Sequence, residues 1–467
     1  MKSIAPQKEF EEQYNMRDGH LIISVVALAT TLATALPVNA ANETANHEAR
    51  ISELEATVKR LEALLEQQYS ELDESCARVE DVEEALASCA SVEQVEEALA
   101  NPADHTTLYN ETEIKVGGYV KMDALVSDYS DAPTRGVGDD FFIPSTIRTS
   151  GEPGDPRLNL HAKETRFWLK SFTPTERGDI TTHFEIDFQT GEQGNERVSN
   201  SFSPRVRHAM LSWDGWTVGQ TWSNFFNVSA LPDYLDFIGP VGVTFVRQAQ
   251  IRYTRPASNG DWAISLENPE TTLTPYGGGS RIDADDSSFP DVVVRRNWSG
   301  DWGNFSVAAL ARELKIDQQG IDDAEIGGAI SVAGKFSVGE RDDLRWQLNY
   351  GNALGRYMGL NAFNVGALDA NNEIELTSQY GALAAYRHVW NDRLHSSFGA
   401  SIARADNDTA ISGFAVPDSY QSAHADIIWS PVKRMSLGAE YIWARREDES
   451  SDDGMLNRLQ ISAKYVY

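Results

Sequence analysis

From residue 114 to the end of the chain, hydrophobic and polar residues alternate with a period of two. In the segment 180–188, for example, Phe184 and Ile186 alternate with Glu185 and Asp187. This is the period of a β-strand, whose successive side chains point to opposite faces of the sheet. A soluble β-sandwich alternates in the same way, so the connections between the strands decide the fold class.

The alternating segments predict sixteen strands, an even number, at 114–126, 164–172, 179–189, 205–213, 216–222, 244–254, 261–267, 291–298, 303–313, 325–338, 343–350, 377–390, 393–404, 419–430, 433–445 and 456–467. Every second connection is short. The others are long and cover 127–163, 190–204, 223–243, 268–290, 314–324, 351–376, 405–418 and 446–455. Short turns at one end and long loops at the other are typical of bacterial outer-membrane barrels. The sequence therefore predicts an all-β membrane protein: a sixteen-stranded antiparallel transmembrane β-barrel at 114–467, with both barrel termini in the periplasm.

Aromatic residues gather at the ends of the predicted strands, where a membrane barrel carries its interfacial girdles. The group comprises Trp213, Trp216, Tyr253, Trp262, Trp298, Trp302, Tyr350, Tyr380, Trp390, Trp429, Trp443 and Tyr465. Mean hydropathy is only −0.40. A low value does not argue against a barrel, because only alternate residues of each strand face lipid.

The N-terminal 40 residues predict an export signal. An apolar run from Leu21 to Leu36 is followed by small residues at Val38 and Ala40, the positions that a signal peptidase reads. The part before Leu21 is long for a leader, and a start at Met16 would give an ordinary length. The alternative interpretation of the run is a buried core helix.

Between residues 41 and 100 the period changes to that of a coiled coil. Core positions recur every three or four residues through six heptads, and ten of the twelve are apolar. They are Ile51, Leu54, Val58, Leu61, Leu65, Gln68, Leu72, Ser75, Val79, Val82, Leu86 and Cys89. We expect a periplasmic coiled coil at 41–100 and a linker at 101–113. A single amphipathic helix on a globular surface is the alternative.

Charge and composition exclude several functions. The net charge is −30, and the segment 41–100 contributes 16 acidic against 4 basic residues. Nucleic-acid binding needs clustered cations, so we expect none. Cys76 and Cys89 would lie about 20 Å apart on one helix at 1.5 Å per residue, too far to pair with each other. No metal-ligand spacing, cofactor motif or recognisable nucleophile arrangement is present, so we predict no metal site, no cofactor and no enzyme activity.

A barrel of sixteen strands leaves a water-filled interior. By the alternation, eight arginines face that interior and are the predicted anion-binding residues: Arg166, Arg207, Arg252, Arg295, Arg312, Arg345, Arg387 and Arg458. Guanidinium groups along a channel wall concentrate anions and bind carboxylates with two hydrogen bonds. Glu185, Asp187 and Glu267 face the same interior. The alternative is therefore a balanced set of charges without strong selectivity.

The third long loop, 223–243, is more apolar than an exposed loop. We expect it to fold inward and narrow the channel, with Asp233, Tyr234, Asp236 and Phe237 at the constriction. The alternative is that it packs at a subunit interface.

Several segments between 114 and 254 resemble the DcaP-like trimeric outer-membrane porins. They include Lys115 to Asp123, Val218 to Phe225, Asp236 to Gly242 and Arg247 to Thr254. The resemblance implies a homotrimer of sixteen-stranded barrels that takes up small anions, dicarboxylates among them. A long acidic helix containing two cysteines departs from the family pattern and leaves the role of that segment open.

These observations predict a porin in the outer membrane of a Gram-negative bacterium. It would form a homotrimer through the coiled coil and the barrel walls, contact lipid and lipopolysaccharide, and pass small hydrophilic solutes with a preference for anions. The alternative function is structural, with the coiled coil tethering the outer membrane to the cell wall or to a periplasmic partner.

Overall fold

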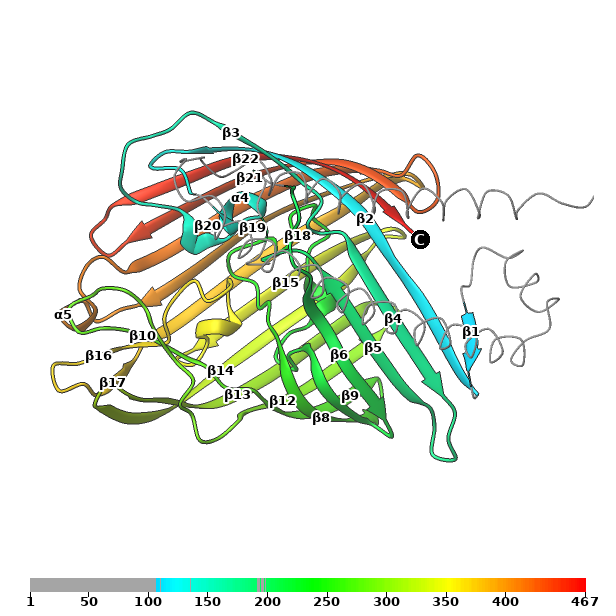
Figure 1. Cartoon of the computed structure of the whole chain (residues 1–467), viewed down its shortest axis with the longest axis horizontal. Helices are drawn as coiled ribbons and strands as arrows, with labels where there is room; N and C mark the ends of the chain where they lie inside the picture. The colour runs from blue at the N-terminus through cyan, green and yellow to red at the C-terminus, as the bar shows by residue number, and fades with distance from the viewer. Residues whose placement is uncertain (1–105, 110, 135, 191–193, 195–196, 198) are drawn as a thin grey trace, which may run out of the picture. The chain divides into compact units, whose positions relative to one another are not determined.

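Sixteen antiparallel strands close into one barrel in the computed structural model, which describes residues 106–109, 111–134, 136–190, 194, 197 and 199–467 (Figure 1). The predicted fold class is confirmed for the barrel. The wall strands are β2 (Thr112–Tyr129), β4 (Arg166–Thr173), β5 (Ile180–Asp187), β6 (Arg205–Trp213), β7 (Trp216–Trp222), β8 (Arg247–Ala257), β9 (Gly260–Glu267), β12 (Asp291–Gly300), β13 (Gly303–Gln318), β14 (Ile321–Val338), β15 (Asp342–Gly351), β18 (Ser378–Asn391), β19 (Leu394–Asp406), β20 (Pro417–Trp429), β21 (Met435–Asp448) and β22 (Asp453–Val466). The barrel closes where β22 pairs with β2, from Tyr119↔Val466 to Tyr129↔Leu456.

Each predicted strand overlaps one wall strand, and the ranges 205–213 and 216–222 coincide with β6 and β7. Two predicted long loops are wrong. The segment 314–324 is the tip of the β13–β14 hairpin, with only 319–320 between the strands, and in 446–455 only 449–452 separates β21 from β22. Both segments continue as paired strands beyond the part of the wall that faces lipid. The segment 446–455 is polar, whereas in 314–324 the apolar side chains of Leu314 and Ile316 are buried on the inner side.

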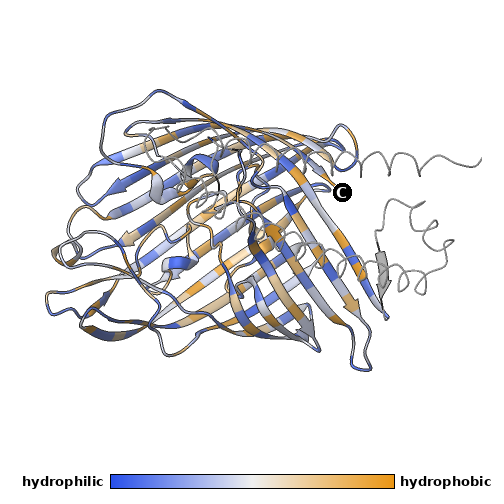
Figure 2. Ribbon diagram, in the orientation of Figure 1, coloured by the Kyte–Doolittle hydropathy of each residue, from blue (hydrophilic) through white to orange (hydrophobic). Residues whose placement is uncertain are grey.

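The two faces of the wall differ in chemistry, as the alternating bands along each strand show (Figure 2). On β15, Leu348 and Tyr350 are 53% and 64% exposed, whereas Gln347 and Asn349 are 0% and 3% exposed. The apolar side chains therefore point outward and the polar ones inward, which is the arrangement of a barrel with lipid outside.

A β-bulge explains why the strand 205–213 has no cleanly apolar face. The register shifts between Glu185 and Ile186, so that Glu185 pairs with His208 and Ile186 with Val206. Arg207 has no partner in this register, and Arg207 and His208 are both buried. The extra residue puts two successive side chains on the inner side of the wall.

The long loops carry the remaining elements. They are α4 (Val137–Asp140), η1 (Pro144–Thr146), β3 (Arg157–His161), η2 (Val228–Ala230), β10 (Thr271–Thr274), β11 (Ile282–Ala284), η3 (Gly355–Tyr357), β16 (Gly366–Leu368), β17 (Ile374–Leu376) and α5 (Thr409–Ser412). Strands β11, β10, β16 and β17 form a second, small sheet. It lies with α5 at the end of the barrel opposite the C-terminus (Figure 1).

Within the predicted linker 101–113, Thr106–Tyr109 forms β1, which pairs with the first residues of β2 from Thr106↔Lys115 to Tyr109↔Thr112. The predicted signal peptide, the coiled coil, Cys76 and Cys89 lie outside the described residues. In the part of the chain that the structure describes, no helix is long and apolar enough to cross a membrane.

The outward orientation of Ile264 can be tested by adding a charge. We expect Ile264→Arg to destabilise the barrel by about 2–4 kcal/mol, because an arginine near the bilayer midplane loses hydration. Thr254→Arg on the neighbouring strand, whose side chain points inward, is the matched control and should cost much less. Denaturant titration of the barrel in lipid vesicles measures both. Equal losses for the two variants would contradict the assigned faces.

Candidate functional site

The loop 223–246 runs through the inside of the barrel and is fastened to several parts of the wall. The Asn227 side-chain amide donates to Ser306 Oγ on β13 and to the Ala333 carbonyl on β14, at 2.9 and 3.2 Å. Farther along, the Gly242 amide donates to Ser401 Oγ on β19 at 2.8 Å, and its carbonyl accepts from Asn349 on β15 at 2.9 Å. The loop begins at β7 and ends at β8, and these contacts reach strands three to seven positions away from β8 around the wall, so the loop crosses the lumen rather than covering the outside.

The middle of the loop is held by one buried carboxylate. Glu440 Oε2 on β21 accepts from the amides of Leu235 and Asp236 at 2.6 and 2.8 Å. Its other oxygen lies 2.8 Å from Nδ1 of His424. The ammonium of Lys121 on β2 donates to the Leu235 carbonyl at 2.7 Å. Two backbone amides sharing one carboxylate oxygen fix this part of the loop against the wall.

The four predicted constriction residues fall into two pairs. Tyr234 stacks on His424 at 4.7 Å, and Asp236 is buried and accepts from the Phe142 amide, so both hold the loop in place. Asp233 is partly exposed, and Phe237 lies with its ring 5.2 Å from the guanidinium groups of Arg205 and Arg207.

Strands β4 to β6 present cations toward that ring. Arg207 lies 2.6 Å from Glu185 and 2.9 Å from Asp187, while Arg205 lies 2.7 Å from Asp187. Arg166 is 3.5 Å from Glu185. The two carboxylates hold the guanidinium groups in fixed positions around the bulge.

Three further arginines lack an acidic partner. Among the described residues, Arg247, Arg252 and Arg295 have no carboxylate oxygen within 4 Å. The Arg247 guanidinium stacks over the Trp222 ring at 4.4 Å, and Arg295 donates to the Phe226 carbonyl at 3.1 Å. Arg252 and Arg295 lie on strands on either side of β9 and have inward-pointing side chains.

Arg345 and Arg387 share one acid, Asp343. Arg345 lies 2.7 Å from it and also donates to the Leu231 carbonyl of the loop at 2.7 Å. Arg387 lies 3.3 Å from both Asp343 and Asp233. These residues join the wall at β15 and β18 to the loop.

Arg312 and Arg458 also point inward, but they are almost fully buried beneath loops. Arg312 pairs with Asp291 at 3.0 Å and donates to the Ala353 carbonyl at 3.1 Å. Arg458 donates to Ser127 Oγ and to the Gly138 carbonyl at 2.8 and 2.6 Å. Arg207, which is 3% exposed, is buried to nearly the same degree. A solute in the lumen cannot reach these three guanidinium groups, so they are not pore-lining arginines.

Inside the barrel, acids and bases differ in their access to water. The side chains of Arg205 and Arg387 are 26% and 27% exposed, whereas those of Asp187 and Asp343 are 0% and 6% exposed. Across these pairs the carboxylates lie against the wall and the guanidinium groups lie in front of them. The Arg387–Asp233 and Arg207–Glu185 pairs have the opposite order, with side chains 27% against 42% and 3% against 9% exposed, so guanidinium groups cover the carboxylates at Asp187 and Asp343 but not along the whole inner wall.

Sequence reasoning missed Arg205 and Arg247. The position of Arg205 could have been found, because it precedes Arg207 by two residues on the same strand. Arg247 lies in the predicted strand 244–254, five residues before Arg252, so the alternation assigns it to the opposite face. Its guanidinium instead packs over the rings of Trp222 and Phe245, two residues at the ends of the loop. In the described part of the chain, no group of three or more His, Cys, Asp or Glu side chains could hold a metal ion.

Comparison with known proteins identifies the family. The family model described as DcaP outer membrane protein matches residues 65–467. The chain belongs to the DcaP outer membrane protein family. No curated protein sequence matches it.

Among solved structures, the outer membrane channel DcaP of Acinetobacter baumannii has a TM-score of 0.65 at 23% identity, covering 77% of this chain and 99% of that one. OmpT of Vibrio cholerae has a TM-score of 0.49 at 10% identity, covering 78% and 100%. An anion-selective porin from Comamonas acidovorans has a TM-score of 0.46 at 10% identity, covering 76% and 100%. The family expected from the sequence is thus confirmed, and the protein is an outer-membrane channel of the porin type.

Asp233 provides a test that depends on pH. Burial raises its pKa, but a hydrogen bond with His395 and the charges of Arg345, His395 and Arg387 outweigh burial and hold the pKa at about 2. An unfolded aspartate has a pKa of about 3.9. The stabilisation is therefore complete above that value and is lost as the pH falls toward 2.

We expect Asp233→Asn to destabilise the barrel at pH 7 by less than about 1 kcal/mol, because the pair is partly exposed and screened. The difference from the unmodified protein should stay constant down to about pH 5 and disappear near pH 2. Denaturant midpoints at several pH values measure it. Glu375→Gln, an exposed carboxylate with no ion-pair partner among the described residues, is the control. A difference that persists at pH 2 would contradict the assignment.

Proposed function

We propose that this DcaP-family protein is a passive diffusion channel that prefers small anions, dicarboxylates among them. The observation that carries the proposal is the set of inward-pointing guanidinium groups inside the barrel. Those of Arg205 and Arg387 are partly exposed in front of the buried carboxylates of Asp187 and Asp343. Those of Arg247, Arg252 and Arg295 have no acidic partner among the described residues. A solute meets the front layer first, and in a low-dielectric channel the nearest charges dominate its energy. The net charge of −30 does not oppose this preference, because 12 of those charges belong to the segment 41–100 (16 acidic minus 4 basic residues).

The solute path in this proposal runs between the loop and strands β4 to β8. Among the described residues, side chains of β2, β9, β12, β13, β15 and β19 to β22 hydrogen-bond the loop, whereas no side chain of β4 to β6 does. Toward β4 to β6 the loop presents Phe237 beneath Arg205 and Arg207. This side has cations on the wall and an aromatic ring on the loop.

Arg252 and Arg295 are the proposed carboxylate-binding pair. Because one strand lies between theirs, the two backbones are about 10 Å apart at about 4.8 Å per strand. A guanidinium group binds a carboxylate with two parallel hydrogen bonds. Two such groups without acidic partners at this spacing suit a solute that carries two carboxylates.

The functional unit is proposed to be a homotrimer in the outer membrane, surrounded by lipid and lipopolysaccharide. Family membership and the predicted coiled coil at 41–100 support it. The short turns between strands face the periplasm in this proposal, which puts the coiled coil on the periplasmic side.

Anion preference is tested by the reversal potential in a planar bilayer under a potassium chloride gradient. We expect the unmodified channel to favour chloride, and Arg252→Gln combined with Arg295→Gln to lower the chloride-to-potassium permeability ratio several-fold, because the mobile anion loses two inward-pointing cations that have no acidic partner among the described residues. Arg296→Gln is the matched control. It follows Arg295 in the chain but lies on the outer face, with its guanidinium 4.9 Å from the Trp298 ring.

Cation preference in the unmodified channel would overturn the proposed selectivity for anions. An unchanged chloride-to-potassium permeability ratio in the double variant would show that Arg252 and Arg295 do not set the selectivity. Absence of conductance would overturn the channel function itself.

A second candidate function is mechanical. The backbone pairing of β1 with β2 fastens the N-terminal segment to the wall, which is what a tether requires. If the coiled coil binds the cell wall, removing residues 41–100 should abolish co-sedimentation of the protein with peptidoglycan and leave single-channel conductance unchanged. Unchanged co-sedimentation of the shortened protein would exclude the tether.

A further inference from the structure

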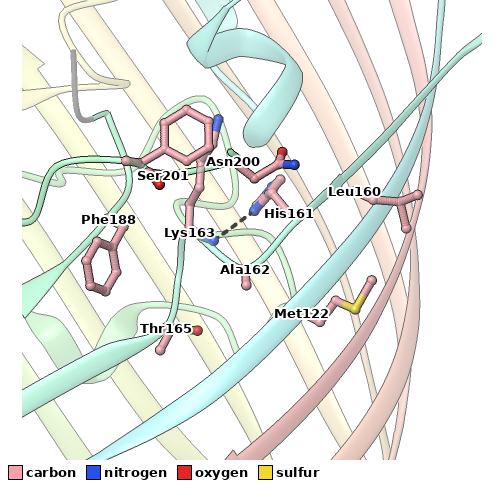
Figure 3. A pocket seen from close by; sticks show the side chains of 10 residues that line it. Met122, Leu160, His161, Ala162, Lys163, Thr165, Phe188, Asn200 and Ser201 are labelled. Carbon is pink, nitrogen blue, oxygen red and sulfur yellow. Dashed lines mark hydrogen bonds between the residues drawn. The ribbon is translucent and has the colours of Figure 1, made fainter. Parts of the chain in front are cut away.

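The wall of the barrel is interrupted beside β2, between β3 and β4. Strand β3 pairs with Asp123 to Ser127 of β2, whereas β4 pairs only up to Tyr119. In the gap, the Thr165 hydroxyl replaces the missing strand, because it accepts from the Lys121 amide and donates to the Lys121 carbonyl, both at 3.2 Å. The segment 162–165 forms a turn, and a pocket of about 570 Å³ opens beside it (Figure 3). The backbone of β2 is thus satisfied at the break, which is an ordered part of the wall.

Lys163 lies in this turn, and its side chain is directed to the inside of the barrel. Its ammonium lies 2.8 and 2.7 Å from the two carboxylate oxygens of Asp140, the last residue of α4. The side chains of Lys163 and Asp140 are only 11% and 6% exposed. Among the described residues, no other cation lies within 4 Å of this carboxylate. The end of α4 is therefore attached to the wall by a buried ion pair.

Two further side chains hold the same end of α4. The Lys163 amide donates to Nδ1 of His161 at 3.3 Å (Figure 3). Since an amide can only donate, Nδ1 is the acceptor and the ring proton is on Nε2, which donates to the Asp140 carbonyl at 2.8 Å. The Asn159 amide donates to the Asp140 carboxylate at 3.0 Å. Asn159, His161 and Lys163 are alternate residues, so one inner edge of the wall fixes Asp140 from three points.

The residues that follow Asp140 support the constriction. The Phe141 ring, which is 2% exposed, packs 5.3 Å from the Phe237 ring of the loop 223–246. The next amide, that of Phe142, donates to Asp236 at 2.8 Å. Phe141 belongs to an apolar cluster inside the barrel, against which Phe237 is partly buried. The position of Asp140 therefore determines how far Phe237 can withdraw into this cluster.

The Lys163 ammonium also contacts the opposite side of the constriction. It lies 3.9 Å from the centre of the Phe202 ring, and Phe202 precedes Arg205 by three residues. Arg205 begins β6, and its guanidinium lies 5.2 Å from the Phe237 ring. One ammonium is thus linked to Phe237 through α4 and to Arg205 through Phe202.

We propose that Lys163 is a positioning residue of the channel: it fixes the distance between Phe237 and Arg205, and with it the size of the anion that passes. A buried ion pair adds little net stability, because the lost hydration of two charges costs about as much as their attraction returns. Its effect here is on geometry. The inference rests on the proposed function, in which solutes pass between the loop and β4 to β8.

Removal of the ammonium has a definite consequence for the constriction. The Asp140 carboxylate would remain buried without a counter-charge, so α4 would move toward water. Phe141 moves with it and leaves space behind Phe237. Phe237 then withdraws from Arg205, and the passage widens.

Fluorine NMR of the full-length protein in detergent micelles tests the positioning without any measurement of conductance. Phe237 is replaced by 4-fluorophenylalanine, which should give one line. Lys163→Met should shift or split that line, because the Phe141 ring beside the fluorine moves. Lys170→Met is the matched control. Lys170 shares the inner face of β4 with Arg166, and its ammonium lies 4.9 Å from the Trp168 ring, so its loss should leave the line in place.

Permeability in planar bilayers tests the effect on solute size. Lys163→Met should raise the permeability of gluconate, a large anion, relative to chloride several-fold. In a channel that already carries Phe237→Ala, the same substitution should change this ratio little, because the ring through which Lys163 acts is gone. Lys170→Met should leave the ratio unchanged.

Asp140→Asn removes the ion pair from its other side without leaving a buried carboxylate, and it should give the same results. It takes the place of Lys163→Met if that variant lacks the heat-modifiable gel migration of a folded barrel. A fluorine line that stays in place in the folded variant would overturn the positioning role, whether or not the channel conducts. A shifted line with an unchanged gluconate-to-chloride ratio would overturn the effect on solute size. Cation preference in the unmodified channel would overturn the proposed function and leave the fluorine result to decide the role of Lys163.

Discussion

Closure of the sheet between β2 and β22 is the constraint on which the rest of the structure depends. A chain in a bilayer must pair its backbone groups internally, and a closed sheet does so without leaving an edge. Eleven residue pairs from Tyr119↔Val466 to Tyr129↔Leu456 complete that closure. Sixteen tilted strands enclose more space than their inward side chains can fill. The loop 223–246 occupies part of this space. Polar groups of the wall hold it there, such as Ser306, which accepts from Asn227, and Glu440, which accepts from the Leu235 amide.

The chemistry of the inner wall follows from that packing. An acid and a base near the wall cannot both remain in water, and in this barrel the short carboxylates of Asp187 and Asp343 are covered while the long guanidinium groups of Arg205 and Arg387 reach past them. A charge buried without a partner costs several kcal/mol. Arg312, one of the most deeply buried arginines, accordingly has an acceptor for each guanidinium nitrogen, namely Asp291 and two carbonyls. Arg458, which has no acidic partner among the described residues, is fully buried and donates to Ser127 Oγ, the Tyr129 hydroxyl and the Gly138 carbonyl. The overall charge of the chain therefore says little about the surface that a solute meets.

The sixteen strands were predictable because each has one face in lipid and the other on the polar interior, so the period of two persists along the wall. Two loops were mispredicted where β13, β14, β21 and β22 extend beyond the lipid-facing wall. The ends of β21 and β22 are polar, and at the end of β13 the apolar side chains of Leu314 and Ile316 face inward, opposite to the pattern of the wall. The β-bulge shifts the register between Glu185 and Ile186 and leaves Arg207 unpaired, which interrupts the period of two. Alternation from Arg207 therefore puts His208 on the outer face, whereas the bulge places it on the inner side. Alternation also put Arg312 and Arg252 on the same face, but it could not separate a buried structural arginine from an accessible one. The difference in burial comes from the long loops that cover Arg312, and no periodic pattern in the sequence predicts where these loops fold.

The layering of acids behind bases is the central claim, and anomalous X-ray scattering from crystals soaked in bromide, and separately in rubidium, tests it most directly. The two ions have opposite charge and can be located independently inside the same barrel. The account predicts bromide beside Arg247, Arg252 or Arg295 and no rubidium beside Asp187 or Asp343. Rubidium at those carboxylates, with no bromide beside the three arginines, would show that the acids and not the bases meet the solute, and would contradict the claim.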